Sequence, residues 1–263
     1  MKTFTSVDGI PSPTMFANFW GPSGVGKSSA LLSFPPPLYI LNFDRQIQQL
    51  FKYLPSSYLN NVFYEEFTGD LNNVNKASAQ HALTVCEKLI QHAFEGGVGS
   101  LLIDGGHRWW DMVKIAKLPK GEDESVPKDY HWPNEYARAI LLALEASPLQ
   151  IGITHPANTV WEGLKTESGR VKPEAFKHLP TVQKLEVFMF VTGREAEVSP
   201  REAEMRIGAA RPSSSFSRHW GEIRVCKYDT SLEGTLLSNI SFRTLYNLCT
   251  NSDWEGELYE PGA

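Results

Sequence analysis

The chain has 263 residues, 41% of them hydrophobic, and a formal net charge of −5. This size and composition allow a substantial buried core, whereas the negative charge excludes a general attraction to polyanions, so binding to nucleic acid would need a local basic face. The three cysteines lie far apart and the seven histidines never fall at zinc-ligand spacings, so we expect neither a disulfide framework nor a structural zinc site.

The sequence shows no signal for a membrane. No run of apolar residues approaches the roughly 20 that a membrane-spanning helix needs. Residues 1–14 also lack the charged, apolar and small-residue succession of a signal peptide. We therefore expect a soluble, cytoplasmic protein without membrane contact.

The first half of the chain alternates short apolar runs with helix-forming segments. Residues 15–20 and 38–43 are apolar and bounded, which predicts two buried strands. Residues 27–34 lie between them, carry helix formers and end at consecutive prolines, so a short helix is expected there. After a segment of weak pattern, residues 75–94 show the apolar repeat of a helix that ends in a glycine-rich turn.

The same alternation continues in the second half. Three more apolar runs predict strands at residues 100–103, 149–154 and 184–192. Helices are expected over residues 108–118 and 134–146.

This order of elements indicates the fold class. Strands that alternate with helices favour an α/β fold with a mostly parallel central sheet and helices on both faces. We expect one domain over residues 15–250, preceded by an N-terminal segment (1–14) and followed by an acidic tail (251–263).

A glycine-rich motif joins the first predicted strand to the first predicted helix. Gly21, Gly26, Lys27 and Ser28 meet the pattern G-x-x-x-x-G-K-[ST]. Glycines let backbone N–H groups wrap phosphates, and the following helix points its positive end at them. Lys27 would neutralise β- and γ-phosphate charge, and the Ser28 hydroxyl would ligate Mg²⁺. The sequence therefore predicts that ATP with Mg²⁺ binds at Gly21, Pro22, Ser23, Gly24, Val25, Gly26, Lys27, Ser28 and Ser29.

A phosphate loop of this kind works with a second carboxylate that holds the magnesium ion, through water, from a neighbouring strand. The apolar strand 100–103 runs directly into Asp104, which is the acid expected in that role. The alternative is that Asp104 caps the turn at Gly105 and Gly106.

Hydrolysis also needs a group that orients or deprotonates the attacking water. Asp44, at the end of the second strand, is the first candidate, and a solvated turn residue is its alternative. Glu65 and Glu66 are rivals if the weakly patterned segment hides an extra strand. Thr154 and His155 end the fourth strand, where a polar side chain can contact the γ-phosphate. For His155 the alternative is a structural role.

With these residues in place, the chain resembles the RecA-like P-loop ATPases encoded by many bacteriophages, one branch of which comprises the Sak-type single-strand annealing proteins. The resemblance covers residues 15–194, and it includes Phe34-Pro35 soon after the P-loop and the aromatic pair Trp109 and Trp110 after the acidic strand. It implies a RecA-like ATPase fold, a role in DNA recombination or replication, and a homo-oligomeric ring or filament.

Two positions near strand ends matter for turnover. The second strand of such proteins typically ends Asp-Thr-Glu-Gly, whereas here it reads Asn42-Phe43-Asp44-Arg45. Asp44 would replace the longer Glu, which puts the rate of hydrolysis in question more than nucleotide binding. Arg194 ends the fifth strand, and in ring or filament ATPases such an arginine can reach the neighbour's γ-phosphate. A surface salt bridge is the alternative for Arg194.

RecA-type proteins contact single-stranded DNA through loops after the fourth and fifth strands, which correspond to residues 156–183 and 195–219. Basic residues alternate with aromatic ones in both, as sequence-independent binding requires. They are Lys165, Arg170, Lys172, Lys177 and His178 with Trp161 and Phe176 in the first, and Arg206, Arg211 and Arg218 with Phe216 in the second. An ordinary solvated surface is the alternative, because glutamates nearly cancel the charge of the first.

Two other classes of function stay open at this point. A P-loop kinase for small molecules or nucleotides would carry an arginine-rich lid, and no arginine cluster occurs between Asp104 and Gln150. A nucleotide-binding virion assembly protein without turnover would be compatible with the altered motif around Asp44.

Overall fold

The computed structural model describes residues 13–44, 47–67, 74–119, 124–162, 166–192, 218–238 and 240–250. Its strands are β1 (Phe16–Gly21), β2 (Leu38–Asn42), β3 (Val62–Glu66), β4 (Ser100–Asp104), β5 (Gln150–Glu162), β6 (Thr166–Pro173), β7 (Leu185–Thr192), β8 (Arg218–Cys226) and β9 (Leu236–Ser238). They form a mixed sheet in the order β3-β2-β4-β5-β1-β7-β8-β9, with β6 paired to β5 outside this path.

Most of the sheet is parallel, as expected. Strands β3, β2, β4, β5, β1 and β7 all pair in parallel, whereas β8 and β9 add antiparallel strands beyond β7. Because β5 lies between β1 and β4, the strand that enters the glycine-rich loop and the strand that ends at Asp104 are next-but-one neighbours. The carboxyl ends of these parallel strands meet at one edge, where ligands of open α/β sheets bind.

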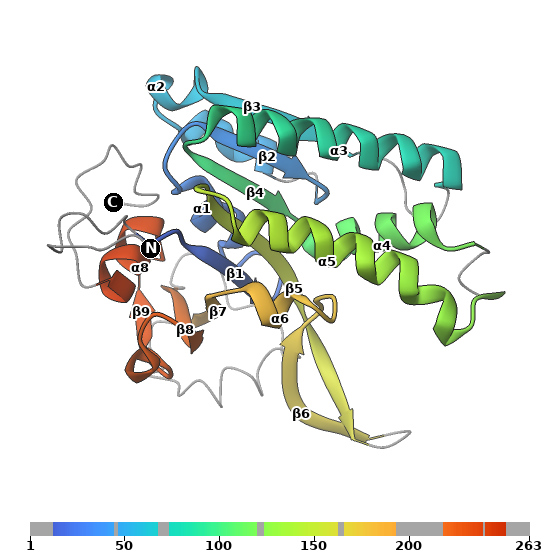
Figure 1. Ribbon diagram of the computed structural model, residues 1–263. Helices are drawn as coiled ribbons and strands as arrows, with labels where there is room; N and C mark the ends of the chain where they lie inside the picture. The colour runs from blue at the N-terminus through green and yellow to red at the C-terminus, as the bar shows by residue number, and fades with distance from the viewer. Residues whose placement is uncertain are drawn as a thin grey trace, which may run out of the picture.

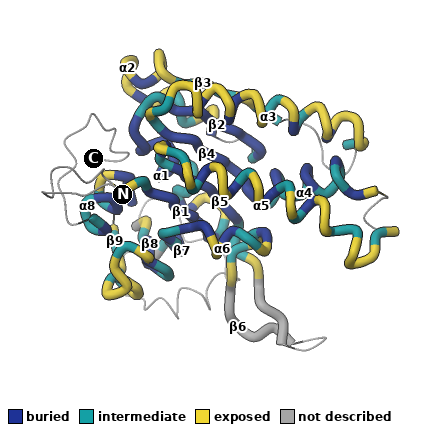
Figure 2. The backbone as a smooth tube through the Cα atoms, in the orientation of Figure 1, coloured by how far each residue is buried: buried dark blue, intermediate teal, exposed yellow. Residues whose placement is uncertain are grey.

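Helices cover both faces of the sheet (Figure 1). The longer ones are α1 (Lys27–Leu32), α3 (Lys76–Gly96), α4 (Gly106–Lys117), α5 (His131–Glu145) and α8 (Phe242–Thr250), and α2 (Ser56–Leu59) and α6 (Leu179–Val182) are single turns. Residues of α3, α4 and α5 pack with one side of the strands, and those of α1 and α8 pack with the other. The central strands are accordingly buried, while the outer sides of the helices are exposed (Figure 2).

The helix after the glycine-rich loop sits close to the sheet because one strand position lacks a side chain. A Cβ built on Gly152 of β5 would lie 2.5 Å from Cδ2 of Leu31 in α1 and 3.1 Å from Cδ2 of Leu102 in β4. Leu31 is fully buried. Gly152 therefore allows α1, and with it the loop, to lie directly over β5 and β4.

The predicted strands and helices are all present, and the weakly patterned segment does contain a strand, β3. The β5–β6 hairpin, β8, β9 and α8 were not predicted. Helix α5 begins at His131, three residues before the expected start at residue 134, so Pro133 lies in its first turn. A proline fits there because the first-turn N–H groups have no partner within the helix. The α/β fold class with helices on both faces is confirmed.

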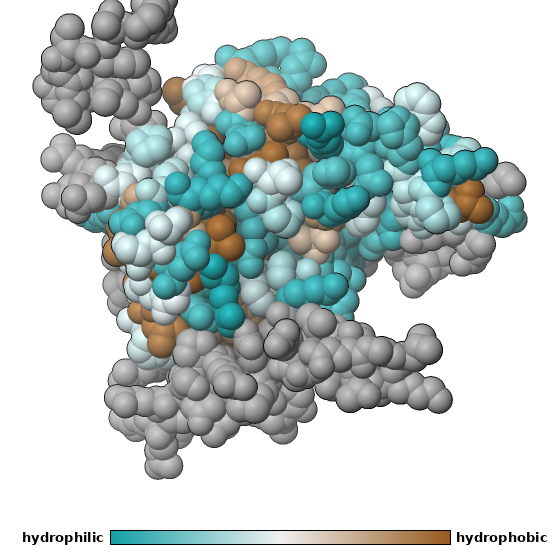
Figure 3. Space-filling view, turned by 60° about the horizontal axis from the view of Figure 1, so that its bottom comes forward, coloured by the Kyte–Doolittle hydropathy of each residue, from teal (hydrophilic) through white to brown (hydrophobic). Residues whose placement is uncertain are grey.

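The described part of the face drawn in Figure 3 is largely hydrophilic. Figure 3 shows hydrophobic residues on one face as small separate patches among hydrophilic ones, and exposed apolar side chains such as Val98 and Trp132 lie on different elements. Within the described ranges, every helix is too short or too polar to cross a membrane.

We predict that Leu31 and Gly152 are energetically coupled. Leu31→Ala should lower the free energy of unfolding by about 2–5 kcal/mol through the cavity it leaves, and Gly152→Ala by about 1–3 kcal/mol through overpacking. In the double variant the new methyl group enters the space left by Leu31, so the loss should be smaller than the sum. Urea unfolding of the four proteins measures this, with exposed Leu142→Ala as a control, and strict additivity would contradict the packing described.

Candidate functional site

The glycine-rich loop between β1 and α1 has the backbone of a phosphate cradle. Gly21, Gly24 and Gly26 have φ angles of 153°, 80° and 93°, which side-chain-bearing residues rarely adopt. A Cβ on Gly21 would also overlap the carbonyl oxygen of Met189 in β7. Lys27 folds back over the loop, where its Nζ donates to the carbonyl oxygens of Gly21 (2.9 Å) and Pro22 (2.7 Å).

Three side chains converge beside this loop. The Ser28 hydroxyl of α1 donates to the carboxylate of Asp104 at 2.9 Å to Oδ2 and 3.1 Å to Oδ1. The Thr154 hydroxyl of β5 donates to Asp104 Oδ1 at 2.7 Å and accepts from the Gly105 N–H at 2.8 Å. Helix α4 begins after Gly105 without a side-chain cap. Asp104 therefore faces the loop and Thr154 instead of capping the turn.

Burial shifts the pKa values of the charged side chains at this site. Asp104 is 1% exposed, and desolvation raises the pKa of its carboxyl to about 6, although the hydrogen bonds from Thr154 and Ser28 work in the opposite direction. Desolvation likewise lowers the pKa of Lys27, and the charges of Asp44 and Asp104 oppose that shift. A bound cation or a polyphosphate would supply the counter-charge that this buried set lacks.

The donor set fits magnesium and a triphosphate. Mg²⁺ prefers hard oxygen ligands and usually takes only one or two protein ligands plus phosphate oxygens and water. Ser28 and Asp104 offer such oxygens in direct contact. The described parts of the chain contain no cluster of three or more His, Cys, Asp or Glu side chains that could enclose a metal by itself. A Mg²⁺ site that is shared with phosphate oxygens does not require such a cluster.

Asp44 lies at the rim of the same site. Its carboxylate Oδ1 is 3.5 Å from Nε of Arg108 in α4, and both side chains are partly exposed. Its backbone N–H donates to Asn42 Oδ1 at 3.2 Å. Gly105 allows this approach, since a Cβ there would lie 3.3 Å from the Asp44 nitrogen. Asp44 thus has a partly solvated carboxylate paired with Arg108 and a backbone hydrogen-bonded to Asn42.

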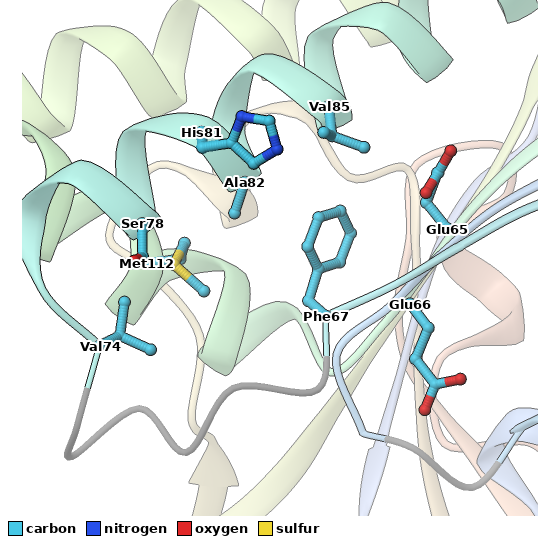
Figure 4. Close-up of a pocket in the computed structure, with 9 residues that line it drawn as sticks. All are labelled: Glu65, Glu66, Phe67, Val74, Ser78, His81, Ala82, Val85 and Met112. Atoms are coloured by element: carbon cyan, nitrogen blue, oxygen red, sulfur yellow. The ribbon is translucent and has the colours of Figure 1, made fainter.

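The rival acids Glu65 and Glu66 lie farther out, on the edge strand β3. They line a cavity of about 280 Å³ between β3, α3 and α4, together with residues such as Phe67 and Met112 (Figure 4). Glu66 Oε2 also accepts a 2.6 Å hydrogen bond from Tyr64. This cavity contains none of the residues of the glycine-rich loop.

The structure does not bring His155 into the Ser28–Asp104–Thr154 group. Side chains alternate along a strand, so His155 shares the side of Ile151 and Ile153, which pack with α3, α4 and α5. Its imidazole is completely buried, and its Nδ1 lies 2.8 Å from Asn18 Oδ1. Because an amide oxygen only accepts, Nδ1 carries the proton. Desolvation, followed by the charges of His107 and Lys27, lowers the pKa of His155 to about 3. The γ-phosphate contact of His155 stays a prediction.

The segment expected as a first DNA-binding loop is instead the β5–β6 hairpin, which projects beyond the sheet (Figure 1), followed by α6. Phe176 is 3% exposed and packs on Trp109 with ring centroids 5.3 Å apart. The interpretation of Phe176 as a base-stacking side chain is therefore wrong. Lys172 and Lys177 are exposed.

Several predicted residues lie outside what the structure describes. These are Arg194, residues 195–217 of the second DNA segment, and the side chains of Trp161, Lys165, Arg170 and Arg218. Sequence reasoning missed Arg108, the partner of Asp44, and Asn18, the partner of His155. Arg108 lies in the first turn of α4, four residues after Asp104, and this short spacing from the end of β4 is the signal that would have indicated it.

No protein-family model matches the chain, and no curated protein matches it. Among solved structures, a prototypical ATPase from the type III secretion system of pathogenic bacteria gives a TM-score of 0.43 and 15% identity over 67% of this chain and 52% of that chain. EscN, the assembled type III secretion ATPase of enteropathogenic E. coli, gives 0.43 and 16% over 67% and 43%. The chain thus spans about half the length of these proteins, and similarity this weak does not bear on function.

The fold class follows from the molecule itself. Strand β1 of the parallel sheet leads through the glycine-rich loop into α1. The next-but-one strand, β4, ends at Asp104, whose carboxylate accepts a hydrogen bond from Ser28 at the start of α1. This is an α/β fold of the P-loop NTPase type.

We predict that His155 makes folding sensitive to acid. The pKa of an unfolded histidine is about 6.5, and in the native protein it is about 3. Between these values the unfolded chain binds a proton that the native protein does not. His155 should therefore lower the free energy of unfolding by up to about 1.4 kcal/mol for each pH unit below 6.5.

The comparison protein is His155→Asn, whose amide can still donate to Asn18 and does not titrate. Urea unfolding at pH 6.5, 5.5 and 4.5 should give it a shallower acid dependence than the parent, whereas His81→Asn, exposed on α3, should keep the parent slope. Equal slopes for His155→Asn and the parent would mean that His155 is not buried in the neutral form.

Proposed function

We propose that this chain binds ATP with Mg²⁺ on residues 21–29 and hydrolyses it. The observation that supports this most directly is the contact between the Ser28 hydroxyl and the buried Asp104 carboxylate, 2.9 Å apart at the head of the loop. A chance match to the glycine-rich motif would not explain why a buried acid from a distant strand contacts that serine. Burying such a carboxylate is costly unless its charge is used or compensated.

The residues divide the work as follows. Lys27 and the loop N–H groups hold the β- and γ-phosphates. Ser28 and Asp104 would hold Mg²⁺, which would neutralise charge on the phosphate oxygens. Thr154 keeps Asp104 oriented, because its hydroxyl is fixed by the Gly105 N–H on one side and by the carboxylate on the other.

Asp44 is the residue that we assign to the attacking water. It lies close enough to the site for its charge to affect the pKa values of both Lys27 and Asp104. Its carboxylate is partly exposed and paired with Arg108, so it can accept a hydrogen bond from water while its position is fixed. A carboxylate shorter than glutamate must sit nearer to the phosphate, which the Gly105 turn permits.

The use of the ATP energy is a further step of the proposal. Following the resemblance to phage RecA-like ATPases, we propose that the protein acts on single-stranded DNA in recombination or replication as a homo-oligomer. Arg194 would then serve a neighbour's site. The β5–β6 hairpin projects beyond the sheet (Figure 1), and the exposed side chains of Lys172 in β6 and of Lys177, four residues after β6, support a contact with DNA.

We expect Asp44→Asn to reduce the turnover number for ATP by about 10²- to 10⁴-fold, the contribution typical of a general base, with an ATP affinity close to that of the parent. Phosphate release without any acceptor, measured beside ATP binding by calorimetry, tests this and separates an ATPase from a kinase. Glu66→Gln, the variant of the rival acid, should leave turnover unchanged.

Lys27→Ala completes the set. It should weaken ATP binding by about 10- to 100-fold, because a charge-assisted contact to phosphate is worth roughly 1.5–3 kcal/mol.

Turnover that persists in Asp44→Asn and falls in Glu66→Gln would reassign the base to Glu66. A nucleotide-binding protein with no turnover in any variant would support an assembly role without hydrolysis.

For DNA, fluorescence anisotropy with a labelled single-stranded oligonucleotide should show binding at low salt that depends on ATP. Lys172→Ala combined with Lys177→Ala should make the plot of log K against log salt shallower by about 1.4, because each single-strand phosphate contact contributes roughly 0.7. Lys88→Ala, exposed on α3, is the control. Absence of ATP-dependent binding at low salt would overturn the DNA role and leave ATP hydrolysis untouched.

A further inference from the structure

The glycine-rich loop has a second flank, on the side of β1 away from Asp104. There β7 lies next to β1 and β8 lies next to β7, with Val191 of β7 paired to His219 of β8. A Cβ built on Gly26 would lie 3.7 Å from His219 Nδ1 and 3.8 Å from Met189 Cε. A strand from the C-terminal part of the chain thus touches the phosphate loop directly.

The contact is a hydrogen bond that fixes the imidazole. His219 Nδ1 lies 3.2 Å from the carbonyl oxygen of Val25, a residue 194 positions earlier in the chain. A carbonyl oxygen only accepts, so Nδ1 must carry the proton. In the neutral ring Nε2 is then a hydrogen-bond acceptor. His219 is an exposed residue, so its ring combines a fixed position with an accessible face.

The order of the sheet says which part of a nucleotide would reach this flank. Ser28 and Asp104, which would hold a metal ion, lie on the side of the loop toward β5 and β4, so the γ end of a metal-bound triphosphate would point there. His219 lies on the other side of β1, beyond β7. A triphosphate that extends across the loop with its γ end toward Asp104 carries its nucleoside toward β7 and β8.

We propose that His219 binds the nucleoside part of the nucleotide. Its Nε2 accepts a hydrogen bond from a donor on the nucleoside, either a ribose hydroxyl or the exocyclic amino group of the base, while the ring face packs against the nucleoside. His219 is then a specificity-determining residue for the loop. The assignment rests on the proposed function, because it requires that the loop holds a nucleoside triphosphate.

A purely structural role for His219 makes a different prediction. If the bond to Val25 only kept the loop in shape, its loss would weaken every ligand of the loop equally. Inorganic tripolyphosphate has the phosphates but no nucleoside, so it separates the two cases. His219→Asn adds a second separation, because its side-chain amide can donate to the Val25 carbonyl as Nδ1 does, yet it lacks both Nε2 and the ring.

The experiment measures the Kd values of ATP and tripolyphosphate, both with Mg²⁺, by calorimetry for the parent, His219→Ala, His219→Asn and the control His131→Ala, which is exposed at the start of α5. We expect both His219 variants to raise the Kd of ATP about 10-fold, as the loss of one good hydrogen bond does, and to leave that of tripolyphosphate unchanged. Thermal unfolding confirms that the variants are folded.

Two nucleotide analogues then identify the donor. If 2′-deoxy-ATP binds the parent as weakly as ATP binds His219→Ala, the ribose 2′-hydroxyl is the donor. If inosine triphosphate does so, the donor is the amino group of adenine. Equal losses for ATP and tripolyphosphate in His219→Ala, or no loss for ATP in either variant, would overturn the nucleoside contact. A parent protein that binds neither ligand would instead overturn the proposed function.

Discussion

The buried carboxylate of Asp104 is the group on which the organisation of the site depends. It ends a strand inside the sheet, where its charge is stable only if neighbouring groups compensate it. Ser28 of α1 and Thr154 of β5 donate hydrogen bonds to it. These bonds connect the start of α1, β5 and the turn before α4 through one side chain. Its raised pKa shows that hydrogen bonds alone do not fully compensate the charge. A cation bound together with the substrate would compensate this charge. The carboxylate that is costly to bury without a cation therefore favours the binding of a metal–nucleotide complex.

The two flanks of the loop are built differently, and each suits one end of a nucleotide. Toward β4 the side chains are carboxylates and hydroxyls, which suit a metal ion and phosphate charge. Toward β8 the buried Met189 packs beside the loop and the exposed His219 is the side chain that we propose for the nucleoside. The second flank exists because the chain returns to the sheet through antiparallel strands after the parallel part is complete. The C-terminal strands thereby become part of the candidate site as well as part of the core.

How far the sequence could predict this depends on the distance over which each feature is determined. The loop was predictable from its glycine-rich motif, and Asp104 was predictable because it directly follows the apolar run 100–103. Thr154 and His155 were both expected at the γ-phosphate, although the alternation of Ile151, Ile153 and His155 is a local signal that would have placed His155 on the core side of β5 and Thr154 on the side of the loop. Burial of Phe176 by Trp109 and the contact of His219 with Val25 are set by tertiary packing, and no pattern within either segment encodes them.

The most direct test of this account is the Mg²⁺ dependence of ATP binding in the Asp104→Asn variant. The asparagine keeps the size of the side chain but removes the charge that we assign to the metal. The parent should bind ATP more tightly with Mg²⁺ than with EDTA, and the variant should lose that difference while it still binds ATP through Lys27 and the loop. An Asp104→Asn protein that keeps the full Mg²⁺ dependence would contradict the central role of this carboxylate.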